Sequence, residues 1–456
     1  MRTHRSAGPG KGGTSRRAGA AAVVAGVVFA GVALAGPSVA SVGQSAPTAP
    51  VAPAGPAIDW SPVAVQPPPG GLSQAALVSL GNITCISNAD CVAAGYLEVP
   101  GPGQSSYPPK GPEDLYRPVL WHWDGHTWSY QVSGTPGSVG LVGTACVSAS
   151  DCWAVGGRFV GKLGNQSVGV ILHYAGKSWS SATFPSPAGA AFNGVACPSA
   201  SNCLVVGTRQ TSAEAAHVLV EEWDGKAWST MSAPSPQGAL WSVMESLNCS
   251  DATDCLALGN ADDSSKGPGY FFAEKFNGIS WSRVTLQSPE PFNMGNASGL
   301  FEISCPSQTD CLAVGGALAY THGEMGADFP GGVAESWNGT SWSAVKPTPQ
   351  VDQGNLVLNG VSCISGDSCW VAMGFPSILG PLGHAIPVAH WNGSSFSVTT
   401  LKTRGFLAGI SCLPENVGTW CIAIGEAPAG TKGTGAAMIG GDFLIASGPL
   451  RGAPKP

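Results

Sequence analysis

The sequence predicts an all-β fold, a seven-bladed β-propeller built from four-stranded antiparallel blades. Turn-forming residues are frequent, with 64 Gly and 37 Pro among 456 residues, and only 11% of the chain is charged. This composition suits many short strands around a sizeable core. The 14 cysteines form seven pairs whose first members lie 49 to 61 residues apart. A period of that size is typical of propellers and solenoids, and each pair defines one repeat.

The first forty residues predict an export signal. They hold five basic and no acidic residues, and an apolar run, Ala18–Ala35, precedes a candidate cleavage site at Ser38-Val39-Ala40. Arg16-Arg17 leaves the Sec and twin-arginine routes open, and the length of the apolar run also leaves open an uncleaved membrane anchor. Residues 41–57 are rich in Ala and Pro and predict an extended linker, and residues 448–456 predict a disordered tail.

The rest of the chain carries 16 basic against 28 acidic groups. This balance excludes nucleic acid as a partner. Together with the export signal, it predicts a secreted or cell-surface monomer that binds an extracellular protein or a glycan. Contact with a membrane is expected only if the signal segment stays uncleaved.

Each repeat between residues 58 and 447 holds four strand-like pieces. The first ends at the first Cys of the pair, and after a short polar turn the second begins at the second Cys, as in Cys152–Gly156. The third ends in an aromatic residue before Asp-Gly or Asn-Gly, as in Trp123-Asp124-Gly125, a dipeptide typical of a type I′ hairpin turn. The fourth opens with Trp-Ser or Phe-Ser. Aromatic residues at these fixed positions are expected to pack blade against blade.

The seventh repeat has no Trp-Ser piece after its third strand, expected at Ala436–Ile439. Such a piece stands instead at the front of the chain, at Asp59-Trp60-Ser61. The economical interpretation is that this N-terminal strand completes the last blade and closes the ring. In the competing interpretation, Phe443–Ala446 is the fourth strand.

The cysteine pairs predict one disulfide within each blade. Export brings the chain into an oxidising environment, and two cysteines across a short hairpin can reach the Cα separation that a disulfide needs. Loop entropy gives about 2.4 kcal/mol for each bridge. Zinc sites use closer spacings and redox catalysis uses Cys-x-x-Cys, so neither fits. The expected bridges are Cys85–Cys91, Cys146–Cys152, Cys197–Cys203, Cys249–Cys255, Cys305–Cys311, Cys363–Cys369 and Cys412–Cys421.

Two of the four connections in each repeat vary, and two are nearly constant. In a meander, the stretches from second to third strand and from fourth strand to next repeat emerge together, and they form the variable face. The Cys-bounded turns and the Asp-Gly or Asn-Gly turns form the fixed-turn face. Variable loops on a constant scaffold usually carry binding. The variable face is therefore the predicted binding face, and strand reversal fully explains the fixed turns.

Small residues three positions before the first Cys should let the innermost strands converge; Asn82 and Glu302 are the exceptions. Glu245 and Glu302 could pair as calcium ligands or as acid and base. Arg158 and Arg209 share a repeat position on the variable face and could clamp an anion. The candidate binding residues are Arg158, Arg209, Trp241, Glu245, Glu302, Asn193 and Asn359.

No catalytic motif stands out, and no cofactor is expected unless Glu245 and Glu302 bind calcium. His122, His173 and His390 share one repeat position, two before the Asp-Gly or Asn-Gly turn or its equivalent, and are expected on a polar outward face and not around a metal. Two functions stay open. The sequence favours a binding or scaffold module without chemistry over a carbohydrate-active or metal-dependent hydrolase with a site at the channel mouth.

The repeated Trp-Asp-Gly-x-x-Trp-Ser pattern carries a resemblance. Residues 59–446 resemble secreted bacterial β-propeller repeat proteins and are similar to the Asp-box and kelch-like repeats of sialidases and galactose-oxidase-type folds. The motifs differ in detail, because Asp124 and Gly125 are adjacent where an Asp-box has Ser-x-Asp-x-Gly-x-x-Trp, and Gly-Gly occurs only at Gly156-Gly157 and Gly315-Gly316. In those families the turns are structural, so the resemblance implies the fold and not the chemistry.

Overall fold

The computed structural model describes fifteen stretches of the chain. The predicted export signal and linker lie outside them, as does the predicted tail beyond Gly448, and these remain predictions. No helix in the described stretches is long and apolar enough to cross a membrane. The described residues are 61–62, 77–98, 116–131, 139–160, 166–185, 188–212, 215–262, 270–287, 299–317, 331–345, 356–374, 385–404, 406–415, 418–427 and 442–448.

Every element in these stretches is a β-strand, and consecutive strands pair antiparallel as four-stranded meanders. The first repeat forms β2 (Leu77–Ser87), β3 (Asp90–Glu98), β4 (Tyr116–Trp123) and β5 (Trp128–Gln131). The second forms β6 (Val139–Ser148), β7 (Asp151–Val160), β8 (Gln166–Tyr174) and β9 (Trp179–Ser181). The fifth forms β18 (Gly299–Ser307), β19 (Asp310–Ala317), β20 (Gly331–Trp337) and β21 (Trp342–Val345), and the sixth forms β22 (Val357–Ser365), β23 (Ser368–Gly374), β24 (Ala385–Trp391) and β25 (Phe396–Arg404).

The third and fourth repeats share one eight-stranded sheet, because a single parallel bridge between Ala216 and Trp241 joins their two meanders. The third repeat forms β10 (Ala190–Ser199), β11 (Asn202–Gln210), β12 (Ala216–Trp223) and β13 (Trp228–Met231). The fourth forms β14 (Trp241–Asp251), β15 (Asp254–Asp262), β16 (Tyr270–Phe276) and β17 (Trp281–Val284).

The last sheet joins the two ends of the chain. It contains β26 (Phe406–Glu415), β27 (Gly418–Ala427), β28 (Asp442–Gly448) and the N-terminal β1 (Ser61–Pro62). β1 pairs antiparallel with β28, with Ser61 opposite Ser447. The N-terminal strand therefore lies where it was predicted, at the outer edge of the last sheet. Phe443–Ala446 belongs to the third strand of that sheet, so its assignment as fourth strand was wrong, and β28 replaces the third strand expected at Ala436–Ile439, which lies outside the described residues.

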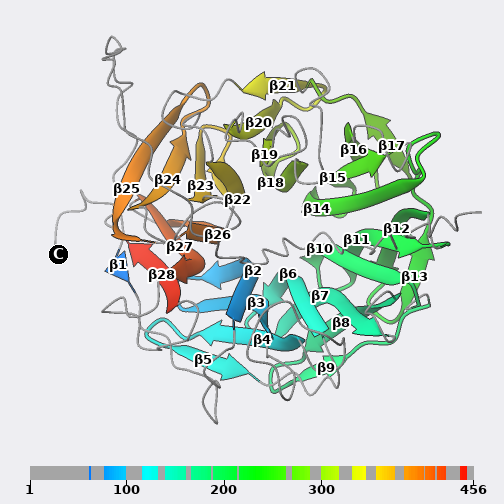
Figure 1. The fold of residues 1–456 in the computed structure, drawn as a ribbon, viewed down its shortest axis with the longest axis horizontal. Coiled ribbons are helices and arrows are strands. Elements are labelled where there is room, and N and C mark those ends of the chain that lie inside the picture. Colours follow the sequence, from blue (N-terminus) through cyan, green and yellow to red (C-terminus); the bar gives the residue numbers. More distant parts are fainter. Residues whose placement is uncertain are drawn as a thin grey trace, which may run out of the picture.

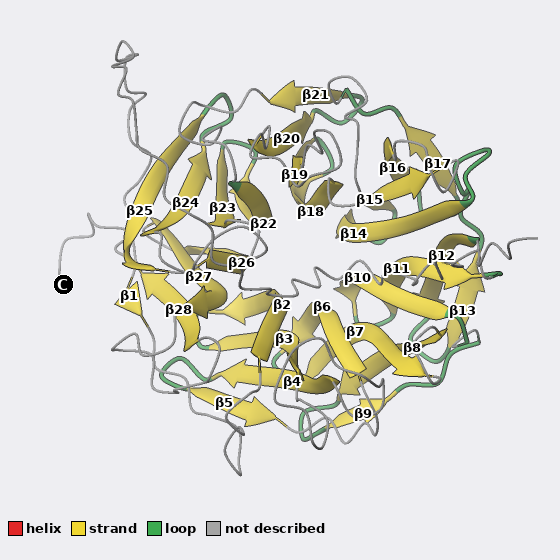
Figure 2. Cartoon of the chain, viewed as in Figure 1, coloured by secondary structure: helices red, strands yellow, loops and turns green. Residues whose placement is uncertain are grey.

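The sheets stand around a common axis (Figure 1). Their first strands contact one another in a closed circuit in the order β2, β6, β10, β14, β18, β22, β26 and back to β2. Figure 2 shows that strands make up the whole described ring, with the later strands of each sheet farther from the axis. This arrangement is an all-β propeller of antiparallel sheets.

All fourteen cysteines form the seven predicted bridges within their own repeats. The paired Cα atoms lie 3.9 to 4.1 Å apart, because the two cysteines face each other across β-strands, as Cys85 and Cys91 do. Bridges of this number indicate an oxidising environment. Peptide mapping of the unreduced protein should find only these local pairs, and any peptide linked across two repeats would contradict the pairing.

Aromatic residues at the ends of the third and fourth strands fill the space between and within the sheets. Trp123 and Trp128 lie 5.7 Å apart, and the equivalent Trp391 and Phe396 lie 5.1 Å apart. Trp153 of the second repeat lies 5.3 Å from Trp223 and 5.1 Å from Trp228, the turn aromatics of the third repeat. The predicted packing of blade against blade is confirmed.

The Asp-Gly and Asn-Gly turns differ from the predicted two-residue hairpin. The flanking pair is Trp123 and Trp128, so four residues lie between the strands. The Asp124 carboxylate accepts hydrogen bonds from the backbone N–H groups of Thr127 and His126, at 2.7 and 2.8 Å, and Gly125 has a φ of +91°. These two N–H groups, Thr127 first, lower the pKa of Asp124. Asp or Asn at this position therefore serves as an acceptor for the turn backbone, although the second repeat forms the equivalent turn with Ala175.

Side-chain acceptors before the first Cys link successive innermost strands. Ser411 Oγ accepts from the backbone N–H of Cys85 at 3.1 Å, so this contact crosses between the last sheet and the first. The same contact recurs with small variations at three other junctions: Asn248 with Cys305, Ser304 with Cys363, and Ser362 with Cys412. These contacts satisfy backbone donors that would otherwise be buried without a partner.

Candidate functional site

The innermost strands carry the candidate residues nearest the axis. Each strand has a β-bulge at the same repeat position, and such bulges change the direction of the neighbouring side chains. Asn193, Glu245 and Asn359 are bulge residues, whereas Glu302 follows one. The bulge residues are Gly81, Val142, Asn193, Glu245, Phe301, Asn359 and Ala408.

The position after the bulge is small because the next innermost strand approaches it closely. A Cβ at Gly143 would lie 2.9 Å from the carbonyl oxygen of Asn193. A Cβ at Gly360 would lie 3.1 Å from the Cα of Gly409. The predicted role of these small residues is confirmed.

Asn82 and Glu302 are the two larger residues at this otherwise small position, and they form a hydrogen bond with each other. The Asn82 amide donates to Glu302 Oε1 at 3.0 Å, although the two residues lie 220 positions apart in the chain. Asn82 Oδ1 accepts from Thr144 Oγ1 at 2.9 Å, and Thr144 Oγ1 lies 3.0 Å from Thr84 Oγ1. This axial network thus links the innermost strands of the fifth, first and second repeats.

Desolvation sets the protonation of Glu302. Part of the residue remains accessible, but removal of its carboxyl from water raises the pKa to about 8, against the lowering effect of the Asn82 amide. The second carboxyl oxygen lies against Gly360, 3.2 Å from where a Cβ would stand. At neutral pH Glu302 is therefore mainly a neutral acid held among amide and hydroxyl groups.

Glu245 has a different set of partners. Its two carboxyl oxygens accept from the side-chain amides of Asn193 and Asn260, each at 3.0 Å. Desolvation raises its pKa to about 8, and the bond from Asn260 lowers it by less. The oxygens Asn193 Oδ1 and Asn260 Oδ1 are buried and have no hydrogen-bond partner among the described residues.

The structure therefore gives the two carboxyls separate surroundings instead of one shared site. No hydrogen bond of the described residues joins Glu245 to Glu302. Within the same stretches, no group of three His, Cys, Asp or Glu side chains is arranged to hold a metal ion. Each carboxyl has an amide donor in another repeat, so both can stabilise the contact between innermost strands.

Asn193 and Asn359 perform one structural task at equivalent positions. The Asn193 amide donates to the carbonyl of Met244 at 3.2 Å, and the Asn359 amide donates to the carbonyl of Leu407 at 2.7 Å. Each acceptor directly precedes the bulge of the next innermost strand it meets. These contacts pair the amide donor of each residue with a neighbouring backbone carbonyl, while Asn193 Oδ1 has no partner among the described residues.

The other candidates lie toward the variable face. Arg158 and Arg209 occupy equivalent positions, opposite Val139 and Ala190, the first residues of β6 and β10. Arg209 is exposed, and its charge counteracts the burial that raises the pKa of Glu221. Trp241 is part-buried at the start of β14.

Strand pairing places Arg209 near Trp241. Arg209 lies opposite His217 on β12, and the adjacent Ala216 pairs with Trp241. Most variable-face loops lie outside the described residues.

Three buried glutamates on third strands were missed by the sequence interpretation. Glu221, Glu274 and Glu335 occupy equivalent positions, and all are fully buried. Desolvation raises the pKa of Glu274 to about 7, opposed by the charge of Arg283, which lies 3.4 Å away. Glu335 accepts from the backbone N–H of Gln287 at 3.0 Å. Their alignment two residues before the turn aromatic was the sequence signal that could have identified them.

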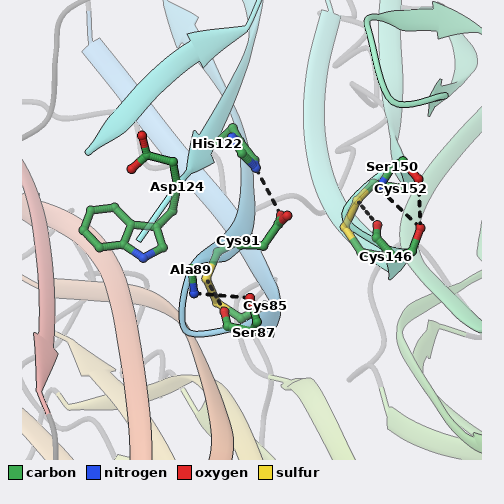
Figure 3. Close-up of polar contacts among 12 residues, drawn as sticks. Cys85, Ser87, Ala89, Cys91, His122, Asp124, Cys146, Ser150 and Cys152 are labelled. Carbon is green, nitrogen blue, oxygen red and sulfur yellow. Dashed lines mark hydrogen bonds and ion pairs between the residues drawn. A yellow bond between two sulfur atoms is a disulfide. The ribbon is translucent and has the colours of Figure 1, made fainter. Parts of the chain in front are cut away.

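The histidines at the shared repeat position point to strand b, the second strand of their repeat. His122 lies 3.1 Å from Asp90, and His173 lies 2.8 Å from Asp151. Figure 3 shows His122 near the Cys85–Cys91 bridge. The side chains of His122 and His173 are 25% and 31% exposed, as expected for a polar position. His390 differs from this expectation, because it is only 4% exposed and desolvation lowers its pKa.

Comparison with known proteins finds solved structures of similar fold but no matching family. No protein-family model matches the chain, and no curated protein matches it significantly. The structure of U3-55K is 11% identical, covers 84% of this chain and 100% of that chain, and has a TM-score of 0.47. YCF48 from Cyanidioschyzon merolae is 12% identical, covers 87% and 100%, and scores 0.46. An α-L-arabinofuranosidase of Fusarium graminearum in complex with arabinobiose is 11% identical, covers 86% and 98%, and scores 0.44. The propeller assignment rests on the strand pairing of this chain.

Proposed function

We propose that this chain is an exported seven-bladed propeller that binds an extracellular protein or glycan through its variable face and performs no chemistry of its own. Seven disulfides suit an oxidising environment outside the cytoplasm. The closed circuit of innermost strands supports seven blades. Loops that differ between repeats, carried on a constant scaffold, support the variable face as the place of binding.

The state of the axial carboxyls is the observation that favours binding over hydrolysis. A glycosidase with two catalytic carboxyls needs one protonated and one ionised group flanking the substrate. Here burial raises the pKa of both Glu245 and Glu302 to about 8, so their surroundings do not favour one protonated and one ionised group. Their bonds to Asn193, Asn260 and Asn82 also occupy carboxyl oxygens that a substrate would have to reach.

A hydrolase is the second candidate, because a carboxyl with a raised pKa is suited to act as a general acid. If Glu302 had that role, Glu302→Gln would abolish hydrolysis of a chromogenic glycoside panel by the folded protein. Under the binding proposal, the wild-type protein shows no turnover that Glu302→Gln removes, and it still binds its ligand after that substitution.

Binding should map to the variable face. With a ligand identified on a glycan array, we expect Trp241→Ala and Arg158→Ala each to weaken binding by more than the roughly 0.5 kcal/mol typical of neutral surface changes. Lys226→Ala, in a fixed turn of the third repeat, is the matched control and should leave affinity unchanged. Isothermal titration calorimetry measures the affinity of each variant. If Lys226→Ala alone lost binding, the site would lie on the fixed-turn face.

A further inference from the structure

The fixed-turn face carries a cavity of about 160 Å³ between the fifth and sixth repeats. Asn338 in its wall is exposed, so the cavity reaches the surface of the fixed-turn face. Residues from both kinds of fixed turn and from the adjoining strands line it, among them Asp310, Ser336, Trp337, Asn338, Gly366 and Trp391. The fixed turns need no cavity to reverse the chain between strands, so this cavity needs a separate explanation.

The preceding junction, between the fourth and fifth repeats, shows how a lysine side chain can fill such a space. There the ammonium of Lys275 lies 2.6 Å from Asp254 Oδ2 and 5.5 Å from the centre of the Trp337 ring. The Gln308 amide closes the same junction by donating to Asp251 Oδ2 at 2.6 Å. A lysine side chain is thus held between a carboxylate and an aromatic ring.

The later junction keeps the carboxylate and the ring but lacks the lysine. Asp310 and Trp391 stand at the positions of Asp254 and Trp337. Ser336 stands at the position of Lys275, and Gly366 stands at that of Gln308. Two long side chains are therefore replaced by small ones, and this difference leaves the cavity.

The Asp310 carboxylate is positioned for a cation. Its Oδ2 accepts from Ser307 Oγ at 2.6 Å and from Thr309 Oγ1 at 3.0 Å. Its Oδ1 lies 2.6 Å from where a Cβ at residue 366 would stand, so a larger residue at Gly366 would require the Asp310 side chain to shift. In the stretches that the structure describes, no basic side chain forms an ion pair with Asp310.

We propose that this cavity binds the side chain of a lysine from a partner protein, with the ammonium between Asp310 and Trp391. A carboxylate gives a charge-assisted hydrogen bond to an ammonium, and the face of a tryptophan attracts the same cation. The unbranched alkyl stem lies along Trp337 and Trp391, as amphipathic side chains do on apolar surface. The site is independent of the variable face, so the failure of either proposal leaves the other standing.

Titration with Nα-acetyl-lysine methylamide, followed by tryptophan fluorescence and calorimetry, tests the site. We expect saturable binding to the full chain, at least tenfold weaker for Asp310→Asn and absent for Ser336→Lys. Asp124→Asn is the matched control, because it removes one charge from the same face and Asn already occupies the equivalent position in Asn338 and Asn392. It should leave the affinity unchanged.

Chemical controls separate the ammonium from other features of the probe. The Nε-acetylated lysine derivative should not bind, and equal binding of that neutral form would overturn the proposal. Equal affinity of the wild type and Asp310→Asn would overturn it as well. Binding of n-butylammonium without binding of the lysine derivative would show that a small free amine, and not a partner's lysine, is the occupant.

Ser336→Lys also gives a readout without any ligand. A lysine at this position should fill the cavity as Lys275 fills its own junction, and it should raise the melting temperature. The rise should disappear when Asp310→Asn is present in the same chain, because the two residues then no longer form an ion pair. An equal rise in both backgrounds would contradict the assigned role of Asp310.

Discussion

Deleting residues 58–66 should lower the melting temperature by about 2–3 °C, whereas deleting residues 41–57 should leave it unchanged. The first deletion removes β1 from β28 and exposes the edge of the last sheet. Loss of this pairing costs about 2 kcal/mol. An unfolding entropy of about 2.1 cal/mol/K per residue, over the roughly 390 residues from 58 to 447, converts that cost to about 2–3 °C. Thermal unfolding followed by circular dichroism measures both deletions.

Ser411→Ala tests the contact between the last sheet and the first without shortening the chain. It leaves the buried N–H of Cys85 without its acceptor, which costs about 1–3 kcal/mol. Ser362→Ala is the matched comparison, because it removes the same kind of contact between the sixth sheet and Cys412 of the last, and it should cost a similar amount. Equal melting temperatures for the two deletions would show that β1 does not hold the last sheet.

Stability should fall as the pH rises from about 4.5 to about 8. Burial raises the pKa of Glu245 and Glu302 to about 8 and that of Glu274 to about 7, against a usual value of 4.5. In this range the unfolded chain loses protons that the folded chain retains, so ionisation favours unfolding. Below pH 4.5 both states are protonated, and above pH 8 both are ionised, so the dependence flattens at each end.

Glu302→Gln should reduce this pH dependence. Gln is a neutral group of similar shape, so the variant should unfold a few degrees higher than the wild type at pH 8.5 and close to it at pH 5. Glu222→Gln, on the outer strand β12, removes the same charge and serves as the control. A pH profile of the melting temperature that is identical for Glu302→Gln and the wild type would exclude a raised pKa at Glu302.

The features that could be predicted from the sequence are those that repeat at fixed spacing. Cysteine pairs, turn aromatics and the misplaced Trp60-Ser61 motif each have a local signature, and they led to the disulfides, the packing and the pairing of β1. The Asp-Gly and Asn-Gly dipeptides predicted the wrong type of turn. The prediction used only their tolerance of positive φ, whereas the Asp124 carboxylate accepts hydrogen bonds from two later backbone N–H groups.

The roles of the axial residues could not be predicted in the same way. Asn82 and Glu302 are 220 positions apart, and nothing near either one shows that the other is its partner. The sequence likewise did not reveal that the amides of Asn193 and Asn359, at β-bulges, donate to the backbone of a neighbouring innermost strand. The cavity at Ser336 could not be predicted from the sequence. It depends on two small residues in different repeats, and neither residue type is unusual at its position.

The antiparallel pairing of Ser61 with Ser447 makes the two chain ends leave the ring at the same point. Ser61 and Ser447 are therefore neighbours, and a peptide that joined the chain on either side of them would give a circular permutant. New ends placed before Leu77 would then make every meander contiguous in the chain. In the natural order the last sheet combines β1 with β26, β27 and β28, so the ring cannot be completed before β28 has been synthesised.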